Sequence, residues 1–198
     1  MNYPDRNKKL DLLLREVRAC TVCAQHLPHG PRPVLRASAT AKIVIIGQAP
    51  GRKVHESGVP WDDPSGDLLR VWLGVTKGIF YDESRIAIVP TGFCYPGKGT
   101  QGDLPPRPEC APLWHPRLAA LMPQIKLVLL VGQYAHATIL GDRKKSTLTD
   151  TVLHHADYAP RYIPLPHPSP RNRMWLKRNP WFARDIIPQL RKRIAALL

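Results

Sequence analysis

The cysteines are the residues of this 198-residue chain whose spacing points most directly to chemistry. Cys20 and Cys23 form a C-x2-C turn, and the remaining two, Cys94 and Cys110, are separated by fifteen residues. Two thiolates from one tight turn and two from a distant loop can complete a tetrahedral sulfur set, which suits zinc or a [4Fe–4S] cluster. A zinc ribbon normally has a second C-x2-C pair, and the wide second pair here favours the cluster. Four unrelated buried thiols are the alternative.

Two unusual peptides each follow an apolar run. GQAPG, residues 47–51, ends the run AKIVIIG, and HPSPRN, residues 167–172, follows RYIPLP. Backbone N–H groups of the first peptide could bind a phosphate or the carbonyls of a base. Its proline and glycines could equally make only a tight turn. The peptides are therefore candidates for a binding site if the fold brings them together.

An aromatic residue flanked by carboxylates lies at Trp61, Asp62 and Asp63. The indole could stack on a base while one carboxylate orients a water molecule. Asp63 and Ser65 also have the pattern of a helix N-cap, which is a structural alternative for both.

The elements that must position these residues alternate between strand and helix. Apolar runs predict buried strands at residues 41–47, 85–90, 126–132 and 161–166, and helical patterns lie at residues 5–19, 65–76, 113–121, 133–140 and 181–198. This alternation predicts an α/β fold in three layers, α/β/α, with a central four-stranded parallel sheet. Ligands bind such sheets at the carboxyl ends of the strands, where both unusual peptides would lie. We find no repeat or linker and expect one domain over residues 1–198, with the Cys20/Cys23 segment tied to the Cys94–Cys110 loop.

The charge balance indicates the kind of partner. Lys and Arg number 29 against 15 Asp and Glu, a formal net charge of +14. A polyanion is therefore expected, and nucleic acid is the commonest one. No apolar run is long enough to span a bilayer and the N-terminus lacks the apolar segment of a signal peptide, so we expect a cytoplasmic protein without disulfides.

Taken in order, these motifs resemble those of the uracil-DNA glycosylase superfamily, in particular its iron–sulfur branch, often called family 4. That branch has C-x2-C near the N-terminus, GE(A/Q)PG after the first strand, G-x-P-F, a glycine-containing helix start and a widely spaced cysteine pair. The matching positions here are Cys20/Cys23, Gly47–Gly51, Gly58–Trp61, Gly66–Leu69 and Cys94/Cys110. His167–Asn172 is similar to the second catalytic motif and is closest to that of single-strand-selective monofunctional uracil glycosylases. The resemblance runs from about residue 10 to 190.

The resemblance implies hydrolysis of the N-glycosidic bond of uracil in DNA, which leaves an abasic site for base-excision repair. It further implies a monomer that acts on uracil-containing DNA and carries a structural [4Fe–4S] cluster on Cys20, Cys23, Cys94 and Cys110. His167 would donate to the uracil O2, on which negative charge develops as the base leaves, and the backbone N–H groups of Gln48 and Ala49 would assist.

The remaining site residues are expected from the same motifs. Candidates for positioning the attacking water are Gln48, Asp62 and Asp63, of which Gln48 can orient a water but cannot take its proton. The expected substrate-binding residues are Gln48, Ala49, Pro50, Gly51, Trp61, Thr91 and Ser169. The expected DNA-binding residues are Arg107, Ser169, Arg171, Asn172 and Arg173. Arg171 is placed to fill the gap that a flipped base leaves in the duplex.

Five positions depart from the family pattern. Gln48 stands where the motif has glutamate, Val54 and His55 replace an acidic pair, and Trp61 replaces phenylalanine. Pro90 stands where an asparagine reads the edge of uracil. Two alternative functions therefore stay open: a glycosylase for hypoxanthine or xanthine, and a non-catalytic binder of abasic or single-stranded DNA.

Overall fold

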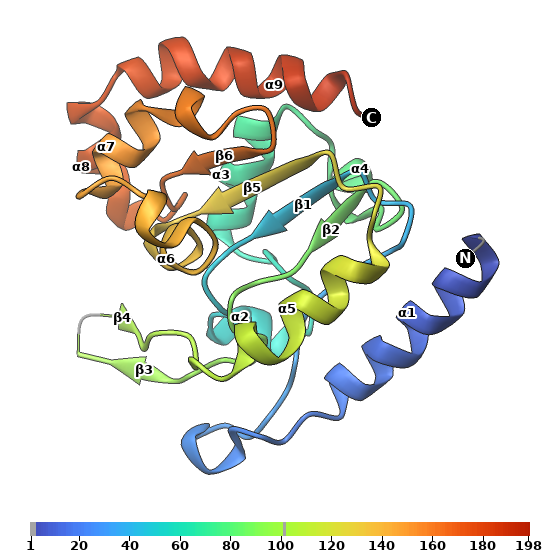
Figure 1. Ribbon diagram of the computed structural model, residues 1–198. Helices are drawn as coiled ribbons and strands as arrows, with labels where there is room; N and C mark the ends of the chain where they lie inside the picture. Colours follow the sequence, from blue (N-terminus) through green and yellow to red (C-terminus); the bar gives the residue numbers. More distant parts are fainter. Residues whose placement is uncertain (1–2, 101) are drawn as a thin grey trace.

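The computed structural model describes residues 3–100 and 102–198 and is built around one parallel sheet (Figure 1). Its strands are β1 (Ile43–Ile46), β2 (Ile86–Ile88), β5 (Leu127–Val131) and β6 (Tyr162–Leu165), in the spatial order β2-β1-β5-β6. All three neighbouring pairs are parallel. The predicted α/β fold with a four-stranded parallel sheet is therefore confirmed.

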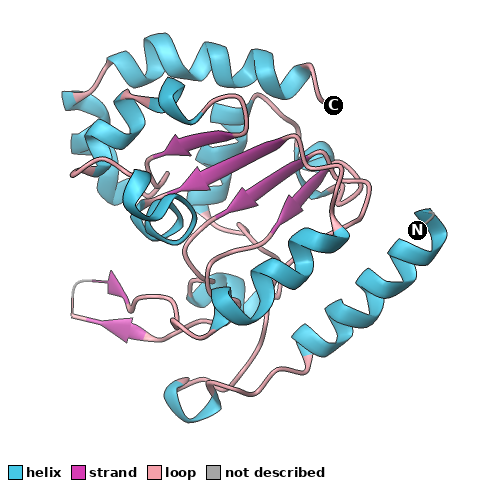
Figure 2. Ribbon diagram, viewed as in Figure 1, coloured by secondary structure: helices cyan, strands magenta, loops and turns pink. Residues whose placement is uncertain are grey.

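Both faces of the sheet are buried. Side chains alternate along a strand, so Ile43 and Ile45 pack in one core while Val44 and Ile46 pack in the other. Helices α3 (Pro64–Leu73) and α9 (Ile187–Ala195) contribute to the first core, and α1 (Tyr3–Arg18) and α5 (Cys110–Leu121) to the second. The resulting layers, helices on either side of the strands, are visible in Figure 2. Burial on both faces explains why the strands are continuous apolar runs.

Shorter elements connect these layers. They are α2 (Arg52–Ser57), α4 (Lys77–Tyr81), α6 (Gln133–Leu140), α7 (Leu148–Leu153), α8 (Arg173–Arg178) and a hairpin of β3 (Lys98–Gly99) with β4 (Gly102–Asp103). Within the described part of the chain, none of the helices combines the length and apolar composition that crossing a membrane requires.

Three predicted helices have different limits in the structure. The helix expected over 65–76 ends at Leu73, because Gly74 adopts a left-handed conformation (φ +68°) and the Thr76 side chain caps α4. The helix expected from residue 113 begins at Cys110. The one expected over 181–198 divides into a π-helical turn, Phe182–Ile186, and α9, with Pro188 in the first turn of α9.

Candidate active site at the carboxyl ends of the strands

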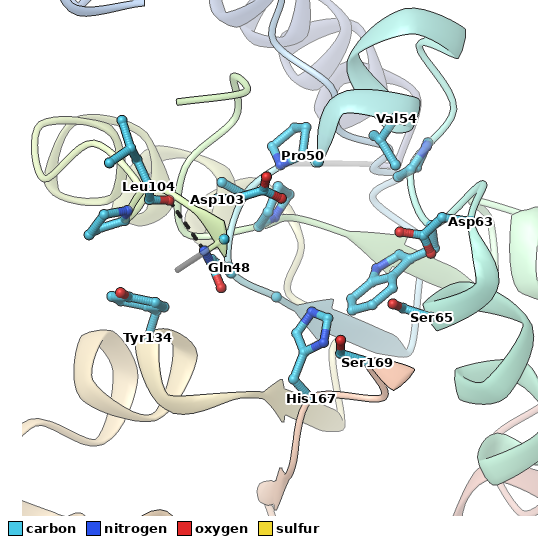
Figure 3. A pocket seen from close by; sticks show the side chains of 18 of the residues that line it. Gln48, Pro50, Val54, Asp63, Ser65, Asp103, Leu104, Tyr134, His167 and Ser169 are labelled. Carbon is cyan, nitrogen blue, oxygen red and sulfur yellow. Dashed lines mark hydrogen bonds between the residues drawn. The ribbon is translucent and has the colours of Figure 1, made fainter. Parts of the chain in front are cut away.

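A cavity of about 790 Å³ lies at the carboxyl edge of the sheet (Figure 3). Its walls include the segments that follow the strands: the turn 47–51 after β1, Pro90 after β2, Tyr134 after β5 and His167 after β6. The β3–β4 hairpin and residues around Trp61 complete it. The two peptides that the sequence placed at strand ends thus line one cavity.

Trp61 is held in an unusual backbone conformation beside the turn 47–51. Its φ is +58°, in the left-handed region that a bulky residue rarely adopts. Two glycines make room for it: a Cβ on Gly47 would lie 2.9 Å from the indole, and one on Gly66 would overlap the Trp61 carbonyl oxygen and lie 2.7 Å from its carbon. Arg70 donates a hydrogen bond to that carbonyl at 3.4 Å, and Tyr81 donates to the Pro60 carbonyl at 3.0 Å. Strain of this kind persists where the surroundings fix it, which is typical of functional sites.

His167 lies opposite Trp61, with 5.5 Å between their ring centroids. Among the described residues its buried Nδ1 has no hydrogen-bond partner, which costs about 1–3 kcal/mol unless a ligand or water satisfies it. Burial lowers the pKa of the imidazole below its ordinary value, and the nearby Asp63 carboxylate opposes this only in part. His167 is therefore a neutral imidazole at pH 7. The Asn172 side chain holds its loop by donating to the His167 carbonyl at 2.8 Å.

The turn 47–51 is fixed from behind by the residues that follow β2. The Thr91 hydroxyl donates to the Gly47 carbonyl at 3.1 Å and to the Gln48 carbonyl. Thr91 is only 2% exposed and is not among the residues that line the cavity. Backbone carbonyls thus engage the Thr91 hydroxyl, and the substrate contact expected of Thr91 stays a prediction that this geometry does not support. The Gln48 amide lines the cavity and donates to the Leu104 carbonyl at 3.4 Å.

Of the two adjacent carboxylates beside Trp61, only Asp63 lines the cavity. One of its oxygens accepts a hydrogen bond from the Gly66 N–H at 2.8 Å, so it caps α3 as the alternative reading of the sequence suggested. Asp62 is exposed and lies outside the lining, because the chain turns at Trp61, whose φ is +58°, and the Asp62 N–H donates back to the Val59 carbonyl at 3.3 Å. The catalytic role expected of Asp62 stays a prediction, and its place outside the cavity does not support it.

The loop after β6 forms the rim of the cavity. Ser169, Arg171 and Asn172 line it, whereas Arg173 begins α8 outside the lining. The Arg171 guanidinium crosses to the β3–β4 hairpin, where a Cβ on Gly102 would overlap its Nη1. The DNA contacts expected of these residues stay predictions.

The four cysteines line a second, smaller cavity with apolar walls that include Leu27, Phe93 and Trp114. Burial raises the pKa of Cys94 to about 11 and that of Cys110 to about 12. Over residues 3–100 and 102–198, no three His, Cys, Asp or Glu side chains stand where they could together hold a metal ion. The Cys20/Cys23 segment and the Cys94–Cys110 loop nevertheless meet here.

Arg107, which was expected to contact DNA from the Cys94–Cys110 loop, lines this cysteine cavity and not the strand-end cavity. Its guanidinium forms an ion pair with Glu109 at 2.5 Å, and Cys23 Sγ lies 3.9 Å from the same carboxylate. The Glu109 carboxylate therefore pairs with the Arg107 guanidinium, whose charge was expected to contact a DNA phosphate.

Tyr134 and Asp103 are among the cavity residues that were not anticipated. Tyr134 is the second residue of α6, directly after β5, and the strand-end rule applied to every strand would have found it. Asp103 ends a hairpin whose strands have two residues each, which is too short for any alternation of side chains to be recognised.

The fold is that of a doubly wound α/β protein, and its cavity lies at the carboxyl ends of the strands, where proteins of this architecture bind ligands. The family model of the uracil DNA glycosylase superfamily matches residues 36–191. The chain belongs to this superfamily, and membership implies DNA glycosylase activity on damaged bases, with damaged DNA as the substrate.

Proposed function

We propose that this protein excises uracil from DNA as a monofunctional glycosylase of the iron–sulfur branch. The observation that carries the proposal is the half-buried His167, which faces Trp61 within the strand-end cavity and whose buried Nδ1 has no partner among the described residues. Hydrolysis of the N-glycosidic bond leaves negative charge on the departing base, and hydrogen-bond donors aimed at that charge lower the barrier. A single such donor is typically worth about 3–4 kcal/mol in the transition state.

The cavity can hold the base by its face and by its edge. The Trp61 indole offers a flat surface for stacking, which is sequence-tolerant. Gln48 contributes to the cavity a side-chain amide, which is both a hydrogen-bond donor and an acceptor. The family's asparagine is absent from this cavity, because Pro90 stands at its position. The nitrogen of that amide is held by the Leu104 carbonyl, and in Figure 3 the oxygen points into the cavity.

Pro90 favours a second candidate within the same chemistry. It lines the cavity, has no N–H to donate, and its carbonyl is hydrogen-bonded by His115 at 2.9 Å. A site that recognises the edge of the base without an asparagine could suit hypoxanthine or xanthine instead of uracil.

DNA would approach the rim formed by Ser169, Arg171 and Asn172. The net charge of +14 favours a polyanion, and a base must leave the helix to enter a cavity at the strand ends. Arg173, exposed at the start of α8, extends this rim.

An oligonucleotide assay separates the candidates. Labelled single- and double-stranded oligonucleotides that carry uracil, hypoxanthine or xanthine are incubated with the protein and then treated with alkali. Strand cleavage at uracil supports the proposal, and cleavage only at another base supports the second candidate. Binding without cleavage at any base contradicts both and indicates a non-catalytic binder.

We further propose that Cys20, Cys23, Cys94 and Cys110 hold a [4Fe–4S] cluster. The donor set fits: four thiols from two segments surround one apolar cavity. A cluster is wider than a single ion, so its thiolates stand farther apart than the four sulfurs around one zinc, which lie about 2.3 Å from the metal. When bound, the cluster supplies a cross-link between the N-terminal segment and the loop before α5. Because burial raises the pKa values of Cys94 and Cys110, these thiols stay protonated until iron binds and displaces the protons.

Replacing one ligand tests this assignment. We expect Cys94→Ser to lose the iron, the sulfide and the visible absorbance that the wild-type protein carries when purified without air. Because the cross-link is lost, the melting temperature should fall by about 5 °C or more. Stoichiometric zinc without sulfide in the wild-type protein would contradict the cluster.

A further inference from the structure

The β3–β4 hairpin brings a second carboxylate, that of Asp103, into the strand-end cavity. Asp103 lines the cavity beside the turn 47–51: a Cβ on Gly51 would lie 3.3 Å from its Oδ2. The Tyr95 hydroxyl faces its other oxygen at 3.5 Å. The absence of a side chain at Gly51 therefore leaves room for this carboxylate directly above the turn.

Contacts from both sides hold this segment in place. The Leu104 N–H donates to the Gly97 carbonyl at 2.9 Å, and the Leu104 carbonyl accepts from Gln48 at 3.4 Å. On the other side, the Arg171 guanidinium lies against Gly102. The hairpin is thus attached both to the turn after β1 and to the loop after β6, which are the two walls of the cavity.

Asp103 meets the requirements for handling the attacking water better than the candidates found in the sequence. Asp62 lies outside the cavity, and Gln48 cannot accept a proton. Asp63 lines the cavity, but the Gly66 N–H donates to one of its oxygens at 2.8 Å, a closer contact than the 3.5 Å between the Tyr95 hydroxyl and Asp103. In Figure 3, Asp103 lies above the Gln48 amide, toward Pro50, whereas His167 lies below it, beside Ser169. A group that receives the departing base and a group that delivers water must be separated in this way.

We propose that the Asp103 carboxylate orients the attacking water and takes its proton, an inference that rests on the proposed glycosylase function. In this step the water oxygen forms a bond to C1′ of the deoxyribose while the C1′–N bond of the base breaks. The bonding electron pair leaves with the base, beside His167, and one water proton passes to the Asp103 carboxylate and then to solvent. The base leaves as an anion and takes a proton from solvent, so the products are the free base and an abasic sugar with a hydroxyl at C1′.

Asp103→Asn tests the assignment because it keeps the size of the side chain and removes its ability to accept a proton. We expect single-turnover cleavage of the best substrate from the oligonucleotide assay to slow by about 100-fold. Binding of an oligonucleotide with uncleavable 2′-fluoro-deoxyuridine should change by less than about threefold, and thermal unfolding should be unchanged. Asp142→Asn, an exposed change outside the cavity, is the matched control and should cleave like wild type.

The outcomes separate the two proposals. Wild-type protein that releases no base at all overturns the glycosylase function and this inference with it. Active wild type with an equally active Asp103→Asn overturns only the role of Asp103. The same holds if the variant loses rate only in proportion to lost binding, or if Asp63→Asn alone abolishes cleavage.

Discussion

His167→Ala is expected to slow base release at least about 100-fold in single-turnover assays, while affinity for uracil-containing DNA stays near that of the wild type. The substitution removes a neutral imidazole that lines the cavity opposite Trp61, and with it the donor aimed at the departing base. The rim residues that we propose contact the DNA backbone are left intact. Because the donor matters mostly once charge has developed, the loss should fall on the rate and not on binding.

His155→Ala is the matched control for this variant. His155 also has a buried Nδ1 without a partner among the described residues, but it lines a different cavity, beside α9. We expect it to retain wild-type turnover. Equal turnover of His167→Ala and His155→Ala would remove His167 from the chemistry.

The pH dependence of the same reaction follows from the burial of His167. The pKa of His167 lies below the ordinary histidine value of 6.5, so the imidazole stays neutral as the pH falls through 6.5. We therefore expect the acid limb of the pH–rate profile, where the rate falls as His167 becomes protonated, to lie below pH 6.5. Asp63 raises this pKa, so Asp63→Asn should move the acid limb to still lower pH. An acid limb at or above 6.5 in the wild type, when binding is saturated, would contradict the assignment.

Gly66→Ala is expected to lower the free energy of unfolding by about 2–3 kcal/mol and to reduce excision as strongly as the loss of a catalytic group. The new methyl group would overlap the backbone carbonyl of Trp61 and lie 2.9 Å from its Cβ. A backbone group cannot move aside as a flexible side chain can, so Trp61 must leave its position beside Gly47. Denaturant unfolding and single-turnover cleavage measure the two effects.

Gly78→Ala provides the control for that experiment. It lies in α4, and the nearest atom to its new Cβ would be the Thr76 hydroxyl oxygen at 3.8 Å, an ordinary contact. Alanine is the better helix former by up to about 1 kcal/mol, so this variant should be as stable as the wild type or slightly more stable. Wild-type stability and cleavage in Gly66→Ala would show that Trp61 is not held as described.

The sheet and the place of the cavity could be predicted because each strand is a short apolar run that ends at glycine or proline. Fully buried parallel strands require such runs, and the carboxyl ends of the strands then share one edge. The end of α3 was harder to predict. Gly74 lies within an otherwise helical pattern, and only its left-handed conformation separates α3 from α4. The Cys20/Cys23 and Cys94/Cys110 pairs were expected to meet, and they line one cavity. Their spacing in the sequence did not determine how the four sulfurs are arranged around it.

The details of the site depended on backbone angles and local partners that residue types do not reveal. Whether Asp62 or Asp63 faces the cavity is decided by the backbone around Trp61, with its φ of +58°. Thr91 and Arg107 carry suitable functional groups, but a backbone carbonyl in one case and Glu109 in the other engage them first. Asp103 reaches the cavity from a hairpin too short to leave a pattern.

The most direct measurement is a crystal structure of the protein with DNA that contains 2′-fluoro-deoxyuridine, whose glycosidic bond resists cleavage. We predict the uracil ring turned out of the DNA, against the Trp61 indole, with its O2 within hydrogen-bonding distance of His167. A uracil still stacked in the DNA, or seated anywhere other than between the turn after β1 and the loop after β6, would contradict base excision at this cavity.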